Sequence, residues 1–423
     1  MTLTRRSFLA HSGLVTVTVA GARLGLDLFS PLGEAAGAAS LQSFGPLPSG
    51  TPILVLIDLQ GGNDATNMLI DLTDPWYYDV PNGHGSIAIQ ESAILPLTGV
   101  SHGLHPSMPW LASRWASDKD VAFVLGTGEN VVHEFSHFAA SHYRQVADFT
   151  GSVGSGWLGR FNDLAAAGSP FASVSIAGVH PTLVGTKTPV LSVSQVAYFD
   201  FNVDWRWQDG WLPAWQAMGG GGAARGTMTR SSELAIADTF AAQSKVFAAS
   251  DSAIAARFDS TDLSQQLAQV AMLVNAGIPS QTYVVTLSGF DTHGNESGAQ
   301  PALFGQLDTA LGQFFDVVGA GSRAGDVFVY ATSEFGRQQT ANGSAGCDHG
   351  QAGVDIIVGG GVRGGLYGKA PLSAPQARLD DALVPTTDFR SVYATILNHL
   401  GRSSAMSTAV LAKHFEDLGV FIA

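Results

Sequence analysis

Short apolar runs, each followed by a polar or glycine-rich cluster, recur along the chain and limit the folds open to it. The runs occupy residues 53–57, 121–125, 283–287, 327–331 and 354–358. Runs of this length without polar interruptions are typical of strands that are buried on both faces of a parallel sheet. Helical patterns lie between them, for example at 229–249, 263–276 and 301–318. The alternation predicts an α/β fold: a doubly wound, mainly parallel sheet with helices on both faces.

The composition permits a large core and excludes two classes of partner. Apolar residues make up 45% of the 423 residues and charged residues only 13%, and the formal net charge is −14. An acidic chain is a poor ligand for nucleic acid and for anionic membrane surfaces. An anionic substrate stays possible, because a bound metal reverses the local charge. We expect one α/β domain over residues 40–423, although the length also allows two or three domains.

The first residues resemble an export signal. The motif Thr4-Arg5-Arg6-Ser7-Phe8-Leu9 precedes an apolar stretch at 13–22 and a run of small residues at 35–39. This order is similar to a twin-arginine signal peptide, and the apolar stretch is too short for a stable membrane span. We therefore expect a signal peptide over residues 1–39, a mature protein without a membrane span, and a periplasmic or secreted location. The implied partner is the twin-arginine export machinery.

Cys347 is the only cysteine in the sequence, so no intramolecular disulfide can form. This agrees with a protein that folds in the cytoplasm before its export. Cys347 stands beside Asp348, where it is either a metal ligand or a small apolar residue that fills the turn.

Polar clusters follow several of the predicted strands. Glu334 follows the run at 327–331, and Asp348-His349 lies between two glycines in the next loop. Ligands of open α/β sheets bind beyond the carboxyl ends of the strands, so functional side chains are expected there. A solvated turn with a loop histidine would explain Asp348-His349 alone, but the pattern recurs.

Two further strands end in the same way. Asp58 and Asp64 follow the run at 53–57, and Asp291 with His293 follows the run at 283–287. Carboxylates gathered at one sheet edge repel one another unless they are protonated or bind a cation. Mixed Asp, Glu and His clusters bind zinc, and oxygen-rich clusters bind magnesium, manganese or calcium. We expect a divalent metal ion, and the predicted ligands are Asp58, Asp64, Asp291, His293, Glu334, Asp348 and His349.

Residues 199–226 differ from the rest. Four tryptophans precede four consecutive glycines at 219–222. The segment is interpreted as an insertion or lid with a glycine hinge, or as an aromatic cluster on the surface of the core.

Eight short motifs are spread over the mature chain. They are Leu59-Gln60-Gly61-Gly62-Asn63-Asp64, Leu104-His105-Pro106, Ser136-His137-Phe138, Gly156-Trp157-Leu158-Gly159-Arg160, Gly289-Phe290-Asp291-Thr292-His293, Ser333-Glu334-Phe335-Gly336-Arg337, Asp348-His349-Gly350 and Pro385-Thr386-Thr387-Asp388-Phe389-Arg390. With these motifs the sequence resembles the DUF1501 family of exported proteins, which is related to the alkaline phosphatase and sulfatase superfamily.

The resemblance implies a mechanism. In the superfamily, a hydroxyl or modified cysteine at a helix start attacks a phosphate or sulfate ester held by metals. The helix N-terminus favours the anion, and the metal lowers the pKa of the nucleophile. Here Ser136 is the candidate nucleophile, with simple N-capping as its alternative role. His137 would orient Ser136 or support a metal ligand.

The sequence also departs from the superfamily. Glu334-Phe335 stands where an Asp-His pair is usual, and Asp291 and His293 are closer together than is usual. Asp58 aligns with the first metal aspartate of the superfamily, whereas Asp64 lies in the DUF1501 motif, and the choice between them stays open. Two functions therefore stay open: an exported metal-dependent hydrolase of phosphate or sulfate esters, or a non-catalytic exported protein that binds an extracellular polymer or a partner.

Replacing Arg5 and Arg6 together by Lys is expected to trap the precursor in the cytoplasm, because the export receptor recognises the paired guanidinium groups. The measurement is the ratio of precursor to mature protein in cytoplasmic and periplasmic fractions. Normal processing of the double variant would contradict the assignment of the signal.

Overall fold

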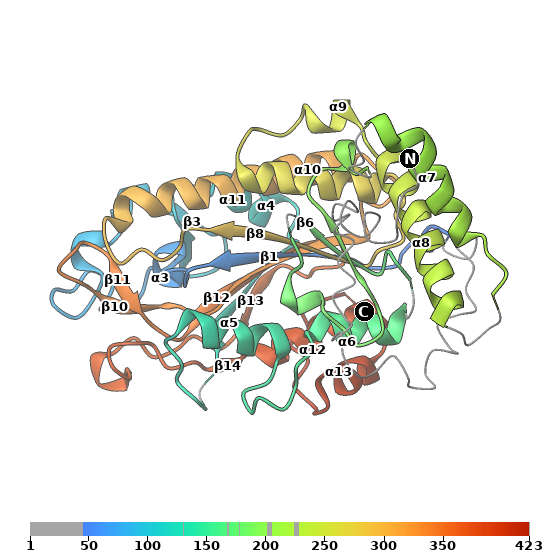
Figure 1. Ribbon diagram of the computed structural model, residues 1–423. Helices are drawn as coiled ribbons and strands as arrows, with labels where there is room; N and C mark the ends of the chain where they lie inside the picture. Colours follow the sequence, from blue (N-terminus) through green and yellow to red (C-terminus); the bar gives the residue numbers. More distant parts are fainter. Residues whose placement is uncertain are drawn as a thin grey trace.

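A nine-stranded sheet runs through the centre of the part of the chain that the structure describes (Figure 1). The structure is a computed structural model, and it describes residues 45–422 except 130, 167–168, 177, 201–204 and 224–227. The predicted signal peptide therefore lies outside the described residues. The strands of the sheet are β1 (Ile53–Gln60), β5 (Val121–Gly128), β6 (Ser173–Ile176), β7 (Val190–Val193), β8 (Thr282–Ser288), β9 (Val327–Ser333), β12 (Gly353–Gly359), β13 (Gly365–Gly368) and β14 (Thr387–Asp388).

The sheet is parallel except for one strand. Its order is β13-β5-β12-β9-β1-β8-β6-β7, and β14 pairs with β5. Only β12 is antiparallel to its neighbours β5 and β9. The reason is its connection: a hairpin of β10 (Arg337–Ala341) and β11 (Cys347–His349) joins β9 to β12, whereas parallel neighbours require a long crossover. The predicted mainly parallel α/β fold is confirmed.

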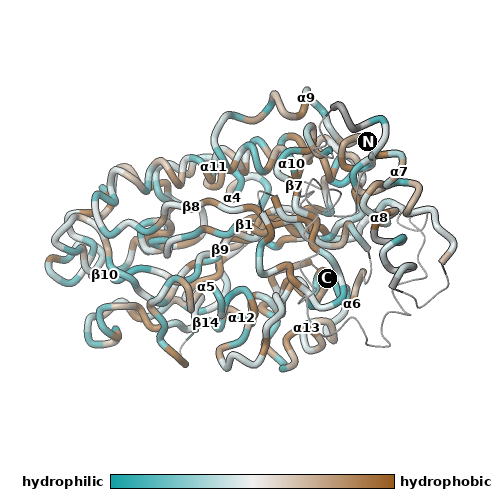
Figure 2. The backbone as a smooth tube through the Cα atoms, in the orientation of Figure 1, coloured by the Kyte–Doolittle hydropathy of each residue, from teal (hydrophilic) through white to brown (hydrophobic). Residues whose placement is uncertain are grey.

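Helices cover both faces of the sheet (Figure 1). One face is covered by α4 (Pro109–Ser117), α10 (Asp262–Asn275) and α11 (Glu296–Gly319). The other is covered by α5 (His137–Val146), α6 (Trp157–Ala165), α12 (Phe389–Gly401) and α13 (Ser404–Leu411). Alternate residues of β1 enter the two cores, because Val55 and Ile57 face the first layer and Leu54 and Leu56 the second. The hydrophobic segments gather in the sheet, and β10 is mostly hydrophilic (Figure 2).

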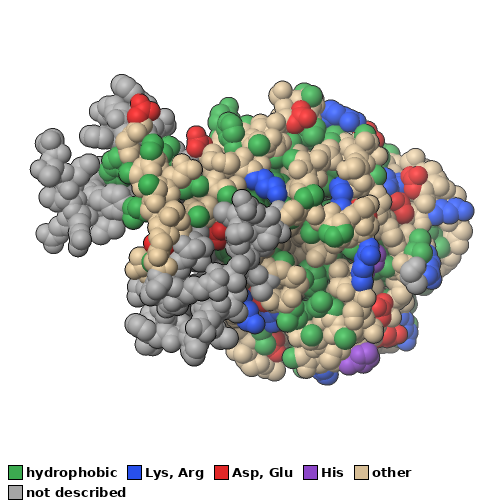
Figure 3. All heavy atoms as spheres, turned by 90° about the vertical axis from the view of Figure 1, so that its right-hand side faces the viewer, with side chains coloured by type: hydrophobic (Ala, Val, Ile, Leu, Met, Phe, Trp, Pro, Cys, Tyr) green, Lys and Arg blue, Asp and Glu red, His purple; other side chains and the backbone are tan. Residues whose placement is uncertain are grey.

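Smaller elements extend from the two ends of the sheet. A second sheet contains β2 (Leu69–Asp71), β3 (Leu95–Pro96) and β4 (His102–Leu104), and it follows the short helix α3 (Ala65–Met68). At the other end, α7 (Trp205–Gly219) packs against α8 (Met228–Ala248), and α9 (Ser252–Ala255) follows. Hydrophobic, basic and acidic side chains are interspersed on that end of the molecule (Figure 3). Among the described residues, no helix has the length and hydropathy required to cross a membrane.

The stack of Trp157 on Tyr393 joins α6 to α12 beneath the sheet. The rings lie 4.3 Å apart at 12°, and Trp157 is 1% exposed. Replacing Trp157 by Ala is expected to lower the free energy of unfolding by about 3–5 kcal/mol, because it leaves a cavity. Leu164→Ala is the control on the same helix: its side chain is exposed, and a change within about 0.5 kcal/mol is expected. Chemical denaturation of both variants is the measurement, and equal effects would contradict this description of the core.

Candidate functional site

The ends of three neighbouring strands lie level at one edge of the sheet. Gln60 of β1 pairs with Ser288 of β8, and Leu59 of β1 pairs with Ser333 of β9. The polar clusters that follow these strands therefore start from the same place. Three residues separate β9 from the hairpin β10–β11, which returns the Asp348-His349 pair to this edge.

Two glycines allow the loops to approach one another. Gly61 and Gly62 have φ angles of +121° and +76°, which glycine adopts without strain. A Cβ atom at Gly61 would overlap the backbone nitrogen of Asp291, and one at Gly62 would overlap the ring of Phe335. The loop after β1 can therefore contact both neighbouring loops only with glycine at these positions.

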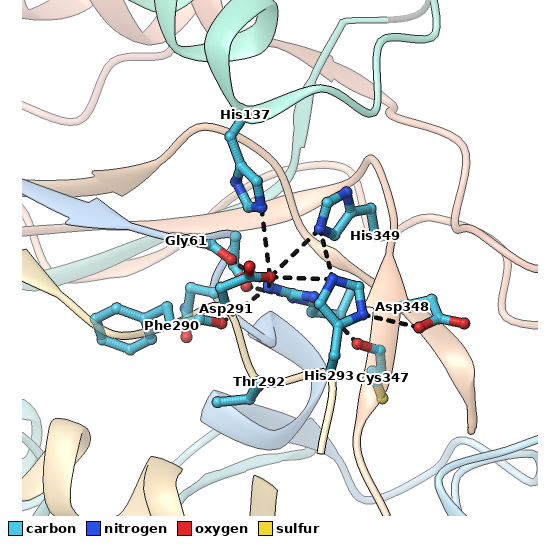
Figure 4. Close-up of polar contacts among 12 residues, drawn as sticks. Gly61, His137, Phe290, Asp291, Thr292, His293, Cys347, Asp348 and His349 are labelled. Carbon is cyan, nitrogen blue, oxygen red and sulfur yellow. Dashed lines mark hydrogen bonds and ion pairs between the residues drawn. The ribbon is translucent and has the colours of Figure 1, made fainter. Parts of the chain in front are cut away.

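Three histidines surround one carboxylate oxygen at this edge (Figure 4). The Nε2 atoms of His137, His293 and His349 lie 3.3, 3.1 and 3.3 Å from Asp291 Oδ1. The Nε2 atoms of His293 and His349 are only 2.8 Å apart. We call His137, Asp291, His293 and His349 the histidine cluster. Asp291 is 49% exposed, so small molecules can reach it from solvent.

The outer nitrogen of each imidazole is held by an oxygen. The partners of the Nδ1 atoms are Glu334 Oε1 for His137 at 2.8 Å, Asp348 Oδ1 for His293 at 2.8 Å and the Phe135 carbonyl oxygen for His349 at 2.7 Å. These oxygens accept, so each Nδ1 donates its hydrogen, and in a neutral imidazole Nε2 then carries a lone pair. Three lone pairs and a carboxylate thus point at one another. Metal-ligating histidines are fixed by acceptors in this same way.

The charges around the cluster agree with a cation site. Partial burial raises the pKa of Asp291, but the hydrogen bond and charge of Arg337 outweigh it and bring this pKa to about 2. Burial lowers the pKa of His349, which favours the neutral form that binds metals. Hydrogen bonds from His293 and Asn342 lower the pKa of Asp348. His137, Asp291 and His349 place their ligand atoms within 4.8 Å of one another.

The structure brings some of the predicted metal ligands together and separates others. Asp291, His293 and His349 are in the cluster. Glu334 and Asp348 lie outside it and accept hydrogen bonds from the Nδ1 atoms of His137 and His293. Asp58 bonds to His180 at 3.1 Å. Asp64 is buried beside His84 at 2.9 Å. Both aspartates are thus engaged in separate contacts.

The two residues predicted to act in catalysis have different positions. Ser136 is the exposed N-cap of α5, and its side chain makes no capping hydrogen bond. His137, the first residue of α5, points into the histidine cluster (Figure 4). Its Nε2 atom is buried and, among the described residues, makes no hydrogen bond that satisfies the usual geometry. His137 is therefore placed where it could bind a metal directly, whereas the sequence suggested that it would orient Ser136 or support a metal ligand.

Two residues at the site were not predicted from the sequence. Arg337 is 1% exposed and donates to Asp291 Oδ1 at 2.7 Å, and Arg144 donates from Nε to the Glu334 carbonyl oxygen at 3.3 Å. The signal in the sequence that could have indicated Arg337 is its position three residues after Glu334.

Helix α7 belongs to the segment that was interpreted as a lid. It lies at the end of the molecule away from β10 and β11, so it does not cover the cluster (Figure 1).

Several solved structures resemble this chain distantly. A protein of the alkaline phosphatase superfamily from Vibrio parahaemolyticus has 10% identity and a TM-score of 0.40, over 93% of this chain and 78% of its own. The lipoteichoic acid synthase LtaP from Listeria monocytogenes has 9% identity and a TM-score of 0.34, over 90% and 81%. Alkaline phosphatase from the Antarctic bacterium TAB5 has 11% identity and a TM-score of 0.31, over 75% and 94%. No curated protein matches the chain.

The comparison with protein families gives one match. Residues 90–417 match the family described as "Protein of unknown function (DUF1501)", and this range includes every member of the histidine cluster. The chain belongs to the DUF1501 family.

Proposed function

We propose that this protein is an exported, metal-dependent hydrolase of phosphate or sulfate esters. The observation that carries the proposal is the histidine cluster: three imidazole Nε2 atoms converge on one ionised carboxylate, and each outer nitrogen is fixed by an acceptor. The export part of the proposal rests on the twin-arginine motif and a periplasmic or secreted location follows from it.

The donor set fits a transition metal. Imidazole nitrogens suit zinc and other first-row transition ions, whereas magnesium and calcium prefer oxygen ligands. His137, Asp291, His293 and His349 would hold the ion, and Glu334 and Asp348 would orient the imidazoles. When bound, such an ion polarises an ester oxygen and lowers the pKa of a coordinated hydroxyl.

Ser136 is the proposed nucleophile. It stands next to His137 at the N-terminus of α5, and its hydroxyl is not used for capping. An ester anion near this terminus would face the unpaired N–H groups of the first turn, which stabilise negative charge. His137 would hold its Nε2 atom toward the cluster while Glu334 retains Nδ1.

Two buried donors support an anionic substrate. Arg144 Nη1 and Gln351 Nε2 have no hydrogen-bond partner among the described residues, and both side chains line a small pocket beside Glu334. Buried donors without acceptors are costly, so an acceptor, either water or an ester oxygen, is expected there. The substrate class is a small anionic ester or an anionic extracellular polymer.

A non-catalytic binding function is the alternative. Asp58 and Asp64, the two candidates for a first metal aspartate, are bound to His180 and His84 instead of joining the cluster. A second metal beside the first therefore lacks its aspartate. A protein that binds an extracellular polymer on the same scaffold would need no second metal.

Replacing His137 by Ala is expected to reduce the zinc content of the protein by about one equivalent, because one ligand of the four is lost. Zinc at 100 times its dissociation constant should stabilise the wild type by about 2.7 kcal/mol through this site, and the variant should lose that increment. His142→Ala, an exposed histidine on the same helix, is the control and should behave as the wild type. Elemental analysis and thermal melts are the measurements. If the wild type bound no divalent metal and its melts ignored added cations, the non-catalytic alternative would be preferred.

Replacing Ser136 by Ala is expected to lower the turnover of aryl phosphate or aryl sulfate esters by more than about a hundredfold, because the attacking oxygen is removed. Its effect on stability should be small, since the hydroxyl caps nothing. Ser403→Ala supplies the reverse control: Ser403 caps α13 through Ala405 N, so stability should fall by about 1 kcal/mol while turnover is kept. A Ser136→Ala variant with full turnover would exclude this nucleophile.

A further inference from the structure

A second group of metal-ligand side chains lies in the interior, apart from the histidine cluster. Asp64, His84 and Cys347 are each 0% exposed, and their ligand atoms lie within 4.8 Å of one another. They come from the N-cap of α3, the residue before the 3-10 turn at Gly85–Ile87, and the first residue of β11. We call these three residues the buried triad.

The contact of His84 with Asp64 requires a cation. His84 donates from Nδ1 to the Gln339 carbonyl oxygen at 2.9 Å, so in the neutral ring the lone pair is on Nε2. This Nε2 atom lies 2.9 Å from Asp64 Oδ2. The other oxygen, Oδ1, is already used, because it accepts from the backbone nitrogens of Thr66 and Asn67. Two lone pairs thus face each other across 2.9 Å, and a proton or a metal ion must lie between them.

A fourth candidate ligand, a carboxyl group, lies beside the triad. Glu296, the first residue of α11, is 0% exposed and contacts both Asp64 and Cys347. Its carboxyl group accepts from Asn67 Nδ2 at 3.2 Å and from Thr292 Oγ1 at 3.3 Å. Burial first, and the Asp64 charge second, raise the pKa of Glu296 to about 9. Its oxygens are not among the ligand atoms that lie within 4.8 Å of one another, so Glu296 would have to move toward the triad to complete a fourfold coordination.

We propose that Asp64, His84 and Cys347, with Glu296 as the fourth side chain, form a buried structural zinc site. Thiolate, imidazole and carboxylate together are the ligand types that zinc prefers, and a site closed on all sides by protein is typical of structural zinc. The backbone carbonyl that holds His84 Nδ1 matches the usual support of a zinc-bound histidine.

The charges balance in this proposal. Without metal, a neutral cluster contains ionised Asp64, protonated His84, the Cys347 thiol and protonated Glu296. Zinc would replace the proton on His84 Nε2 and the proton on Cys347 Sγ, so two positive charges enter as two protons leave. No charge is added to the interior, and the metal-free state is a proton network in the same place.

Such a site would fix two of the chain segments that carry the histidine cluster. Cys347 immediately precedes Asp348 and His349, and Thr292, which bonds to Glu296, lies between Asp291 and His293. An ion held by Cys347 and Glu296 would fix both chain segments. The site is independent of the proposed hydrolase activity, because it offers no open position to a substrate.

Cobalt gives a direct test, because the chain has one cysteine. Full-length protein is produced with cobalt as the added metal, and its absorption spectrum and cobalt content are measured. The wild type and His137→Ala, which alters only the histidine cluster, should both have a thiolate-to-cobalt charge-transfer band in the near ultraviolet. Cys347→Ser should lose this band and about one equivalent of cobalt.

The test remains decisive if Cys347→Ser does not fold. The band in the wild type and in His137→Ala can come only from Cys347, so these two spectra suffice. A wild type that contains cobalt but has no thiolate band, or that contains no cobalt, would overturn the proposal in favour of the proton network. An unchanged cobalt content in a folded Cys347→Ser variant would also overturn it.

Discussion

One buried guanidinium group joins the loops of the site. Arg337 donates to the carbonyl oxygens of Gly61, Gly62, Phe290 and Cys347 and to the carboxylate of Asp291. A buried arginine is tolerated only where acceptors surround it, so these loops must close around it. The loops after β1 and β8 and the hairpin β10–β11 are thereby brought together. Asp291 and His349 are held at the positions from which they can share an ion.

The order and direction of the strands make this arrangement possible. Because β8, β1 and β9 are adjacent and parallel, their carboxyl ends meet at one edge. Helix α5 then adds His137 from the other side, and Glu334, at the end of β9, fixes the ring. The histidine cluster is therefore built from a strand edge, a hairpin and a helix start. The buried triad includes Cys347, the first residue of β11, so the geometry of both groups depends on the position of β11.

The sequence predicted the fold well, because burial of the strands determines where apolar runs occur along the chain. The expected strands at 53–57 and 121–125 lie within β1 and β5. The direction of β12 was not predictable, because it depends on the hairpin connection and not on apolar runs. Asp58 follows an apolar run in sequence, yet β1 continues to Gln60, and Asp58 shares the side of Leu54 and Leu56. The alternation of the strand therefore turns it toward His180.

The site was less predictable than the fold because ligand identity depends on distances between loops. Aspartate and histidine at strand ends indicated a metal, but not that Glu334 and Asp348 would hold histidines instead of the ion.

The most direct measurement of the central claim is anomalous X-ray diffraction from crystals of zinc-loaded protein at the zinc absorption edge. Our account predicts a peak among the Nε2 atoms of His137, His293 and His349 and Asp291 Oδ1. Well-ordered side chains with no peak between them would contradict it.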